Sequence, residues 1–373
     1  MEYLCNIGKQ EEMTELGNNS RFAVIGYGSW ATTIVGKLTQ NGRHVNWHVR
    51  NPEVIEGVLT DGYNPKYVSD MELERSLLFI SQDINEIVAA SDIVILCVPS
   101  AYLKKTMEDL NPALLKGKFV ISAVKGIIPD DYTTVLEFVH DKFGLPFKNL
   151  GLISGPSHAE EVSRGKLSYL TIACNTIEDA EVIALAIRSD TLRISTSTDI
   201  YGIEYAAIMK NIYAIASGMS VGLGYGDNFL AVLVSKSASE LRHFLDSSYP
   251  YERNTSEIAY LGDLLVTCYS PFSRNRQFGT LIGRGCDVKS ALNEMTMEIR
   301  CDTPLGKASD VNYCPFEGES IRLGFNSGYM IDALRACDCD KIKVRFNGPL
   351  SPIVIEPEEG NKFLYLVLPV RIK

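Results

Sequence analysis

A ten-residue stretch near the start of the chain, FAVIGYGSWA at residues 22–31, constrains the fold more than any other segment. Its first four residues are apolar, as in a buried parallel strand, and Gly26, Gly28 and Ala31 follow at the spacing of a dinucleotide-binding turn. The first glycine allows a tight turn, the second leaves room for a pyrophosphate, and the small third residue lets the next helix pack closely. That helix, expected over residues 29–39, would direct its free N–H groups at the phosphates. Because strand–turn–helix junctions also use glycines for geometry alone, the turn by itself leaves a structural role equally open.

Composition limits the classes of protein to which the chain can belong. Its 373 residues are 46% hydrophobic and 22% charged, enough for a sizeable core and two or three domains. A net charge of −10 disfavours nonspecific nucleic-acid binding, which needs clustered lysine and arginine. No run approaches the ~20 apolar residues that span a bilayer, and residues 1–20 lack a secretory signal, so we expect a cytoplasmic protein. The nine cysteines, of which Cys337 and Cys339 are too close for a zinc knuckle, are interpreted as reduced thiols without a metal.

The first half of the chain alternates short apolar runs with amphipathic stretches. Helical patterns, for example at residues 131–143 and 177–187, separate the runs, so we expect parallel strands in a doubly wound, Rossmann-type α/β sheet. In such a sheet ligands bind beyond the carboxyl ends of the strands, so the polar residues there are candidates for a site: Pro99-Ser100, Lys125-Gly126 and Gly155-Pro156-Ser157. The strand candidates are residues 22–26, 44–49, 92–98, 119–124, 149–154 and 169–174.

Two changes of pattern divide the rest of the chain. After about residue 199 the apolar spacing becomes helical, which predicts helices at residues 200–223, 228–246 and 255–269. Beyond residue 298 apolar and polar residues alternate, which predicts strands at 320–325, 341–346 and 363–369 with a helix near 329–336. We therefore predict an N-terminal extension (1–20), a dinucleotide-binding domain (21–195), an all-α domain (196–298) and a small α+β segment (305–373).

Two lysines are candidates for proton transfer, because a hydride acceptor also needs a proton at its oxygen and a lysine of lowered pKa can supply it. Lys125 directly follows a predicted strand, and Lys210 lies in an otherwise apolar helix. For either lysine alone, a solvated surface position is the simpler interpretation. Lys210 is the stronger candidate, because Asn211 beside it could orient a substrate hydroxyl and small neighbours could form a pocket wall: Ala206, Ala207 and Ala214.

The segment LGDLLVTCYSPFSRNRQFG supplies a second group of candidates. Asp263 follows a glycine at an expected helix start, where capping of the helix is an equally good interpretation. The run Ser273-Arg274-Asn275-Arg276 groups two guanidinium groups with an amide and a hydroxyl, a set that suits a phosphate monoester or, alternatively, a solvated basic loop. His158 is interpreted as a loop residue and not as a catalytic base.

The order of these motifs is more specific than any of them alone. GYGSWA, VPS, KGI, SGPSHAEEV, the Lys210-Asn211 pair, GDN, GDLLVT and SRNR follow one another over about residues 20–297. This series resembles bacterial NAD(P)-dependent glycerol-3-phosphate dehydrogenase, and the resemblance implies that Lys210 is the proton donor and acceptor. It implies a substrate site at Lys125, Gly155, Ser157, Lys210, Asp263, Ser273, Arg274 and Asn275. With the turn glycines, the implied cofactor site comprises Gly26, Gly28, Ser29, Trp30, Arg50, Lys125, Ala159 and Arg274.

The end of the chain departs from that family. The resemblance stops at residues 294–297, so a valine and a glutamate that contact the cofactor in the family, and several closing helices, are not matched, which leaves activity uncertain. The segments FNSGYMIDALRACDCDKIKVRFNGPLSPIVIEP and LYLVLPVRIK instead resemble the end of the DNA polymerase III beta subunit, the sliding clamp, over about residues 305–373. Part of the clamp's groove for partner peptides is matched by Leu366, Leu368, Pro369 and Val370. The sequence thus looks like two unrelated proteins joined head to tail.

These observations lead to one expected function and one alternative. We expect an enzyme that uses NADP or NAD to reduce dihydroxyacetone phosphate to sn-glycerol 3-phosphate for glycerophospholipid synthesis. Its partner is then a small phosphorylated substrate, without nucleic acid or membrane, and with a homodimer as one option for assembly. NADPH should serve at least as well as NADH, because Arg50 could pair with a 2′-phosphate and the first carboxylate of that segment is Glu53. The alternative is a chimeric or non-functional fusion whose tail is an interaction fragment of a sliding clamp.

Overall fold

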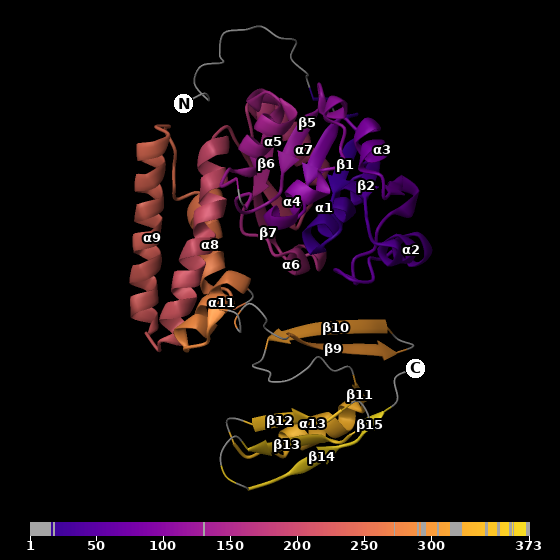
Figure 1. The fold of residues 1–373 in the computed structure, drawn as a ribbon, viewed down its shortest axis with the longest axis vertical. Coiled ribbons are helices and arrows are strands. Elements are labelled where there is room, and N and C mark those ends of the chain that lie inside the picture. Colours follow the sequence, from indigo (N-terminus) through magenta and orange to yellow (C-terminus); the bar gives the residue numbers. More distant parts are fainter. Residues whose placement is uncertain are drawn as a thin grey trace. The chain divides into compact units, whose positions relative to one another are not determined.

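The computed structural model describes residues 16–17, 19–129, 131–271, 273–288, 291, 296–303, 306–313, 323–339, 342–348, 351–357, 360 and 362–370. The chain divides into two compact units, residues 1–292 and residues 293–373 (Figure 1). Several sequence predictions fall partly outside the described residues. They are the N-terminal extension at 1–20, the end of the dehydrogenase-like motif series at 294–295, the first half of the strand at 320–325 and the first residue of the strand at 341–346.

An eight-stranded sheet forms the centre of the first unit, in the order β3-β2-β1-β4-β5-β6-β7-β8. β1, β4, β5 and β6 consist of buried and mostly apolar residues, the composition of strands that are covered on both faces. β1 pairs in parallel with β2 and with β4. The strands are β1 (Phe22–Ile25), β2 (Val45–His48), β3 (Leu78–Ser81), β4 (Ile93–Leu96), β5 (Phe119–Ser122), β6 (Leu150–Ser154), β7 (Ser168–Cys174) and β8 (Leu192–Ser197).

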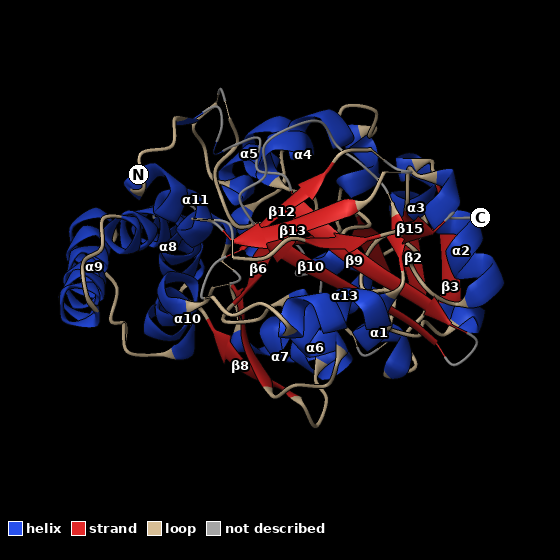
Figure 2. Ribbon diagram, turned by 90° about the horizontal axis from the view of Figure 1, so that it is seen from below, coloured by secondary structure: helices blue, strands red, loops and turns tan. Residues whose placement is uncertain are grey.

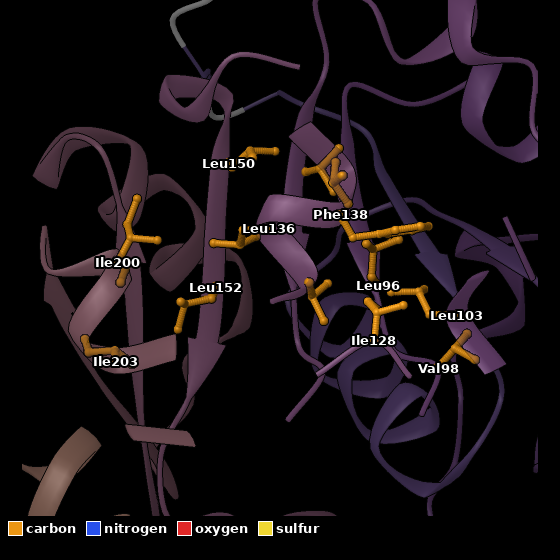
Figure 3. Close-up of a cluster of buried hydrophobic side chains, with 14 of the residues drawn as sticks. Leu96, Val98, Leu103, Ile128, Leu136, Phe138, Leu150, Leu152, Ile200 and Ile203 are labelled. Atoms are coloured by element: carbon orange, nitrogen blue, oxygen red, sulfur yellow. The ribbon is translucent and has the colours of Figure 1, made fainter. Parts of the chain in front are cut away.

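Alternate residues of the strands enter two separate cores. In β1, Ala23 and Ile25 belong to one cluster of buried side chains, whereas Phe22 and Val24 belong to the other. Because successive side chains of a strand point to opposite faces, the two clusters occupy the two faces of the sheet. Figure 3 shows part of the first cluster, where α5 packs on the sheet. This arrangement confirms the expected Rossmann-type architecture.

Helices cover both faces of this sheet (Figure 2). Buried residues of α3, α4 and α5 belong to the first cluster, and buried residues of α1, α2, α6 and α7 belong to the second. α5 begins later than the predicted residue 131, because Thr134 and Glu137 form a capping box that starts the helix at Val135. The helices are α1 (Ser29–Gln40), α2 (Pro52–Asp61), α3 (Ile84–Ala89), α4 (Ser100–Thr106), α5 (Val135–Phe143), α6 (Ala159–Ser163) and α7 (Ile177–Ile187), with short 3-10 turns η2 (Arg75–Leu77), η3 (Pro112–Leu115) and η4 (Phe147–Asn149).

The prediction that all strands are parallel is wrong at one position. β7 runs antiparallel to β6, and β8 runs parallel to β7. The connection between β6 and β7 contains only α6, five residues long. Such a helix rises about 7 Å, less than half of the roughly 16 Å that the chain would have to travel back to begin a parallel strand. The chain therefore reverses at this point instead of crossing over.

The second part of the first unit is helical, as the apolar spacing predicts. α8 (Ile200–Gly222) and α9 (Asp227–Ser248) end within two residues of their predicted bounds. The helix expected at residues 255–269 is wrong in its first part, because a π-helical turn, η5 (Ile258–Gly262), precedes α10 (Asp263–Tyr269). α11 (Arg274–Gly283) then packs along α8.

Glycines bring α8 and α11 into backbone contact. A Cβ atom on Gly218 would lie 1.9 Å from the carbonyl oxygen of Arg276, and one on Gly279 would lie 2.0 Å from that of Ile215. No real Cβ atom tolerates such distances, so the two helices can approach this closely only because both positions lack a side chain. The contact fixes where the N-terminus of α11 lies relative to α8.

The second unit contains short antiparallel sheets. β9 (Thr296–Thr303) pairs with β10 (Gly306–Tyr313), and β12 (Ile342–Phe346), β13 (Ile353–Pro357) and β14 (Tyr365–Val367) form a three-stranded sheet. A small core of Ile353, Ile355 and Val367 lies under α13 (Ser327–Arg335), and β11 (Gly324–Phe325) pairs with β15 (Pro369–Val370). The predicted helix and the strand at 341–346 are present, the described end of the strand at 320–325 forms β11, and the strand at 363–369 is divided into β14 and β15. β13 and the β9–β10 pair were not predicted. Within the described chain, no helix is long and apolar enough to cross a membrane.

Candidate active site

The turn between β1 and α1 has the features that its sequence predicts. Gly26 has φ +117°, and a Cβ atom there would lie 2.6 Å from the carbonyl oxygen of Cys97, so this position requires glycine. Nothing lies within 4 Å of the Cβ position of Gly28, which leaves open space beside the N-terminus of α1. No side chain caps that terminus. Free N–H groups, a helix dipole and an open approach together fit the pyrophosphate of a dinucleotide.

Two buried side chains that the sequence analysis missed hold this turn in place. Asn64 donates hydrogen bonds to the carbonyl oxygen of Tyr27 (3.0 Å) and to the hydroxyl of Thr32 (2.8 Å). Trp47 donates from Nε1 to the carbonyl oxygen of Gly26 (2.7 Å). No local sequence signal could have identified them, because Asn64 is read as a turn residue and Trp47 as core.

The other predicted cofactor residues lie around the same turn. Ser29 and Trp30 are the first residues of α1, and Trp30 packs against the core. Ala159 begins α6 and is tied to α1, because its carbonyl oxygen accepts a hydrogen bond from the Thr33 hydroxyl at 3.4 Å. Arg50 is exposed just beyond β2. That these residues share one cofactor stays a prediction, since the contacts of the described residues tie only Ala159 to α1.

Lys210, the predicted catalytic residue, meets Lys125 and Asp263 of the predicted substrate site near the carboxyl ends of β5 and β6. Lys210 in α8 donates to Oδ1 of Asp263 at 2.5 Å, and both side chains are buried, 6% and 3% exposed. Lys125, which follows β5, donates to Oδ2 of the same carboxylate at 3.4 Å and to the carbonyl oxygen of Gly155 at 2.9 Å. Ser157 lies beside this group, with its hydroxyl 3.4 Å from the Gly155 carbonyl oxygen. Segments distant in sequence thus converge on one carboxylate.

The electrostatics of this group suit proton transfer near neutral pH. Burial and the nearby ammonium of Lys125 lower the pKa of Lys210 to about 7, although the Asp263 carboxylate acts in the opposite direction. Burial alone would raise the pKa of Asp263, but the two ammonium groups hold it below its usual value. Asp263 therefore remains an anion that serves two lysines, and its side chain does not act as a helix cap.

The start of α11 lies against α8 next to Lys210. Ser273 is the N-cap of α11, and its hydroxyl accepts a hydrogen bond from the backbone N–H of Arg276. Asn275 donates to the side-chain oxygen of Asn211 at 2.9 Å, which links the predicted phosphate-binding run to the residue after Lys210. Arg274 is exposed, and no ion pair of its guanidinium is found in the described part of the chain. The guanidinium is therefore available to an anionic ligand.

The remaining candidates have structural positions. Ala206, Ala207 and Ala214 are buried in the packing of α8, in agreement with small residues beside Lys210. His158 is the N-cap residue of α6 by its backbone, and its Nε2 atom is buried without a hydrogen-bond partner. Among the described residues, no group of histidine, cysteine and acidic side chains could hold a metal ion.

Comparison with known families agrees with this geometry. Residues 21–180 match the family described as the N-terminus of NAD-dependent glycerol-3-phosphate dehydrogenase, and residues 199–302 match its C-terminus. Residues 281–371 match the C-terminal domain of the DNA polymerase III beta subunit. This clamp match overlaps the end of the dehydrogenase match at residues 281–302 and covers residues 305–371 of the clamp-like segment predicted at 305–373.

Individual relatives support the first assignment. A glycerol-3-phosphate dehydrogenase [NAD(P)+] of Salinibacter ruber is 35% identical over 280 residues, 75% of this chain and 81% of the relative. One from Chlorobium limicola is 32% identical over 276 residues, 74% of this chain and 83% of the relative. The crystal structure of glycerol-3-phosphate dehydrogenase from Coxiella burnetii matches with a TM-score of 0.65 at 25% identity, over 74% of this chain and 84% of that one. The chain therefore belongs to the NAD-dependent glycerol-3-phosphate dehydrogenase family.

Proposed function

We propose that the first unit reduces dihydroxyacetone phosphate to sn-glycerol 3-phosphate with NADPH or NADH, and that the product serves glycerophospholipid synthesis. The observation that carries the proposal is the buried contact of Lys210 with Asp263, at the end of the sheet where the dinucleotide-binding turn also lies. Relatives named glycerol-3-phosphate dehydrogenase [NAD(P)+] support the choice of substrate and cofactor.

Lys210 is the general acid in this proposal. When bound, the reduced nicotinamide supplies a hydride to the carbonyl carbon of the substrate. The carbonyl oxygen then gains a proton from Nζ of Lys210, which becomes neutral, and the reverse reaction returns that proton to Lys210. A pKa near 7 lets the same group work in both directions at neutral pH. Lys125 and Asp263 position the substrate and set the proton affinity of Lys210.

Arg274 and Asn275 bind the substrate phosphate in this proposal, and Ser273 supports them at the N-terminus of α11. A guanidinium forms two parallel hydrogen bonds with a phosphate, which a lysine cannot do. Asn275 is already oriented by Asn211, so the phosphate would lie next to the lysine that delivers the proton. Residues 21–195 would then supply the cofactor site, and residues 196–298 most of the substrate site.

The proposed cofactor preference depends on the end of β2. A carboxylate near this position favours NAD by binding the ribose hydroxyls. Glu53 is the first carboxylate after β2, and Lys66 holds it in an ion pair at 2.5 Å. Arg50 is exposed and could pair with a 2′-phosphate. We expect NADPH to bind at least as tightly as NADH, and fluorescence titration with both would contradict this by showing a clear preference for NADH.

The decisive experiment compares the full chain with its Lys210→Ala variant. Loss of a general acid–base lowers kcat by roughly 10²–10⁴, whereas the Kd for NADPH should stay nearly the same. Lys37→Ala is the matched control, because Lys37 as a whole residue is 7% exposed, close to the 5% of Lys210, and lies in α1 and not in the lysine–aspartate contact. Turnover of the Lys210→Ala variant at the wild-type rate would refute the assignment, and absence of wild-type turnover would refute the function.

A further inference from the structure

A second buried cluster of polar side chains lies near the first residue of α8. Asp199 caps this helix, because its Oδ1 accepts a hydrogen bond from the backbone N–H of Gly202 at 3.0 Å. Its Oδ2 accepts two further hydrogen bonds, from Nε of Arg253 at 2.7 Å and from the hydroxyl of Tyr260 at 2.5 Å. The side chains of Asp199 and Arg253 are each 2% exposed, so a complete ion pair is enclosed in the helical part of the unit.

We propose that Tyr260 is a positioning residue for the reaction, because its hydrogen bond to Asp199 anchors the π-helical turn that presents Asp263 to Lys210. The inference rests on the proposed role of Lys210. In the described part of the chain the hydroxyl of Tyr260 bonds to Asp199 and to neither lysine, so its effect would be exerted through the position of the Asp263 carboxylate.

The two contacts occur at two points along the same pair of segments. α8 carries Asp199 at its N-cap and Lys210 farther along, a separation of about 16 Å at 1.5 Å per residue. The facing segment carries Tyr260 in η5 and Asp263 as the first residue of α10, and both elements pack on α8. One contact joins Tyr260 to Asp199, and the other joins Asp263 to Lys210. The Tyr260–Asp199 contact therefore fixes the point along α8 at which Asp263 meets Lys210.

The anchor is suited to this task by its charge state and by the element it holds. Burial, and then the hydrogen bond to Asp199, raise the pKa of Tyr260, so its hydroxyl stays protonated and remains a donor. Arg253 compensates the buried charge of Asp199. A π-helical turn is rare, and such turns often occur at functional sites. Here it leads directly into the residue that contacts Lys210.

Release of the anchor should change the proton affinity of Lys210 in a defined direction. If Asp263 moves away, Lys210 keeps its desolvation and its repulsion by Lys125 but loses its anion, so its pKa should fall. The charged and titratable groups that face Lys210 or its neighbours are Asp263 and Cys268 from α10, Lys125 from the loop after β5, and Arg276 from α11. The charge of Arg276 acts to lower the pKa of Cys268. Only Asp263 among them is an anion at neutral pH that opposes this fall.

The test substitutions are Tyr260→Phe and, as matched control, Tyr251→Phe. Both remove one hydroxyl and keep the ring, and Tyr251 belongs to the same cluster, where its hydroxyl bonds to Thr198 at 2.7 Å and its ring lies under Arg253. Among the described residues, no hydrogen bond joins Tyr251 to the π-helical turn. We measure the pH dependence of kcat/KM for dihydroxyacetone phosphate reduction and the hydrogen exchange of amides in residues 258–269 of the full chain.

For Tyr260→Phe we expect the descending limb of the pH profile to move down by about half a unit or more, since an opposite charge within reach shifts a pKa by that amount at least. Amide exchange in residues 258–269 should become several-fold faster, and Tyr251→Phe should show neither effect. A Tyr260→Phe variant with a lower melting temperature but wild-type profile and exchange would overturn the inference. If the wild-type chain shows no turnover, the proposed function fails, and the exchange rates alone decide whether Tyr260 anchors the turn.

Discussion

Replacement of Asp263 by asparagine tests the electrostatics of the site most directly. The carboxylate lies 2.5 Å from Nζ of Lys210 and 3.4 Å from Nζ of Lys125, and it is 3% exposed. Asparagine keeps the shape and one acceptor but removes the charge. Lys210, whose pKa is about 7 with the carboxylate present, then retains only its burial and its repulsion by Lys125. Its pKa should fall by ~1–3, the range that a close opposite charge produces.

The magnitude follows from the fraction of Lys210 that carries a proton. With a pKa of about 7, roughly a quarter of the molecules are protonated at pH 7.5, and with a pKa lower by about 1.5 only about one in a hundred are. Reduction needs the protonated lysine, so kcat/KM at pH 7.5 should fall roughly 25-fold from this cause alone. Oxidation of glycerol 3-phosphate needs the neutral lysine, so its ascending limb should move to lower pH, and its relative rate at pH 6 should rise.

The assay is the full pH profile in both directions, because a loss of positioning would lower the rates without moving either limb. Asp131→Asn is the control, since Asp131 forms an exposed ion pair with Lys104 at 2.8 Å and should leave both profiles unchanged. Limbs that stay where they are in the wild type, or that move to higher pH, would refute the assignment of Asp263 as the anion that maintains the proton on Lys210.

Three other predictions follow from particular contacts. Arg274→Lys should lower kcat/KM for dihydroxyacetone phosphate roughly 10- to 100-fold, because charged hydrogen bonds contribute about 1.5–3 kcal/mol each, and an unchanged value would exclude the phosphate contact. Gly279→Ala places a Cβ atom 2.0 Å from a carbonyl oxygen and should cost about 1–3 kcal/mol in urea unfolding, whereas Gly226→Ala, with nothing within 4 Å, should cost less. Deletion of residues 364–373 should leave turnover unchanged. The full chain should also not bind a clamp-interacting peptide at micromolar concentration. If it does bind, and the deletion abolishes the binding, the result would support a bifunctional fusion.

The sequence was sufficient to predict the elements whose signal is local. Continuous apolar runs predict β1, β4, β5 and β6 because these strands are buried on both faces. β3 and β8 escaped prediction because they are edge strands in which most residues are partly exposed, so no apolar run marks them. Apolar periodicity also carries no information about strand direction, which is why the antiparallel pairing of β6 with β7 could not be read from it.

The candidate site shows the same division between local and distant signals. Lys125, Lys210 and Asp263 were predicted, the last two partly from the order of motifs, and the structure brings all three together. The contact between Asp199 and Tyr260 was not predicted. These residues are 61 positions apart, and each has an ordinary local interpretation, a helix cap and a core aromatic. A contact between distant residues is a property of the packing of α8 against η5, which no single segment encodes.

The site also resolves an apparent conflict between the charge of the chain and the charge of its proposed substrate. The chain as a whole carries a net charge of −10, which would repel a phosphate ester. Within the site, however, Lys125 and Lys210 share the single carboxylate of Asp263. Arg274, whose guanidinium is exposed, directly precedes Asn275, and Asn275 bonds to the residue after Lys210. When Lys210 is protonated, the two lysines and one aspartate therefore carry one positive charge in excess, and the burial of Lys210 makes that excess costly. An anionic substrate would relieve the cost by supplying the missing negative charge, and the same charge would favour the proton on Lys210 at the moment when the reduction needs it.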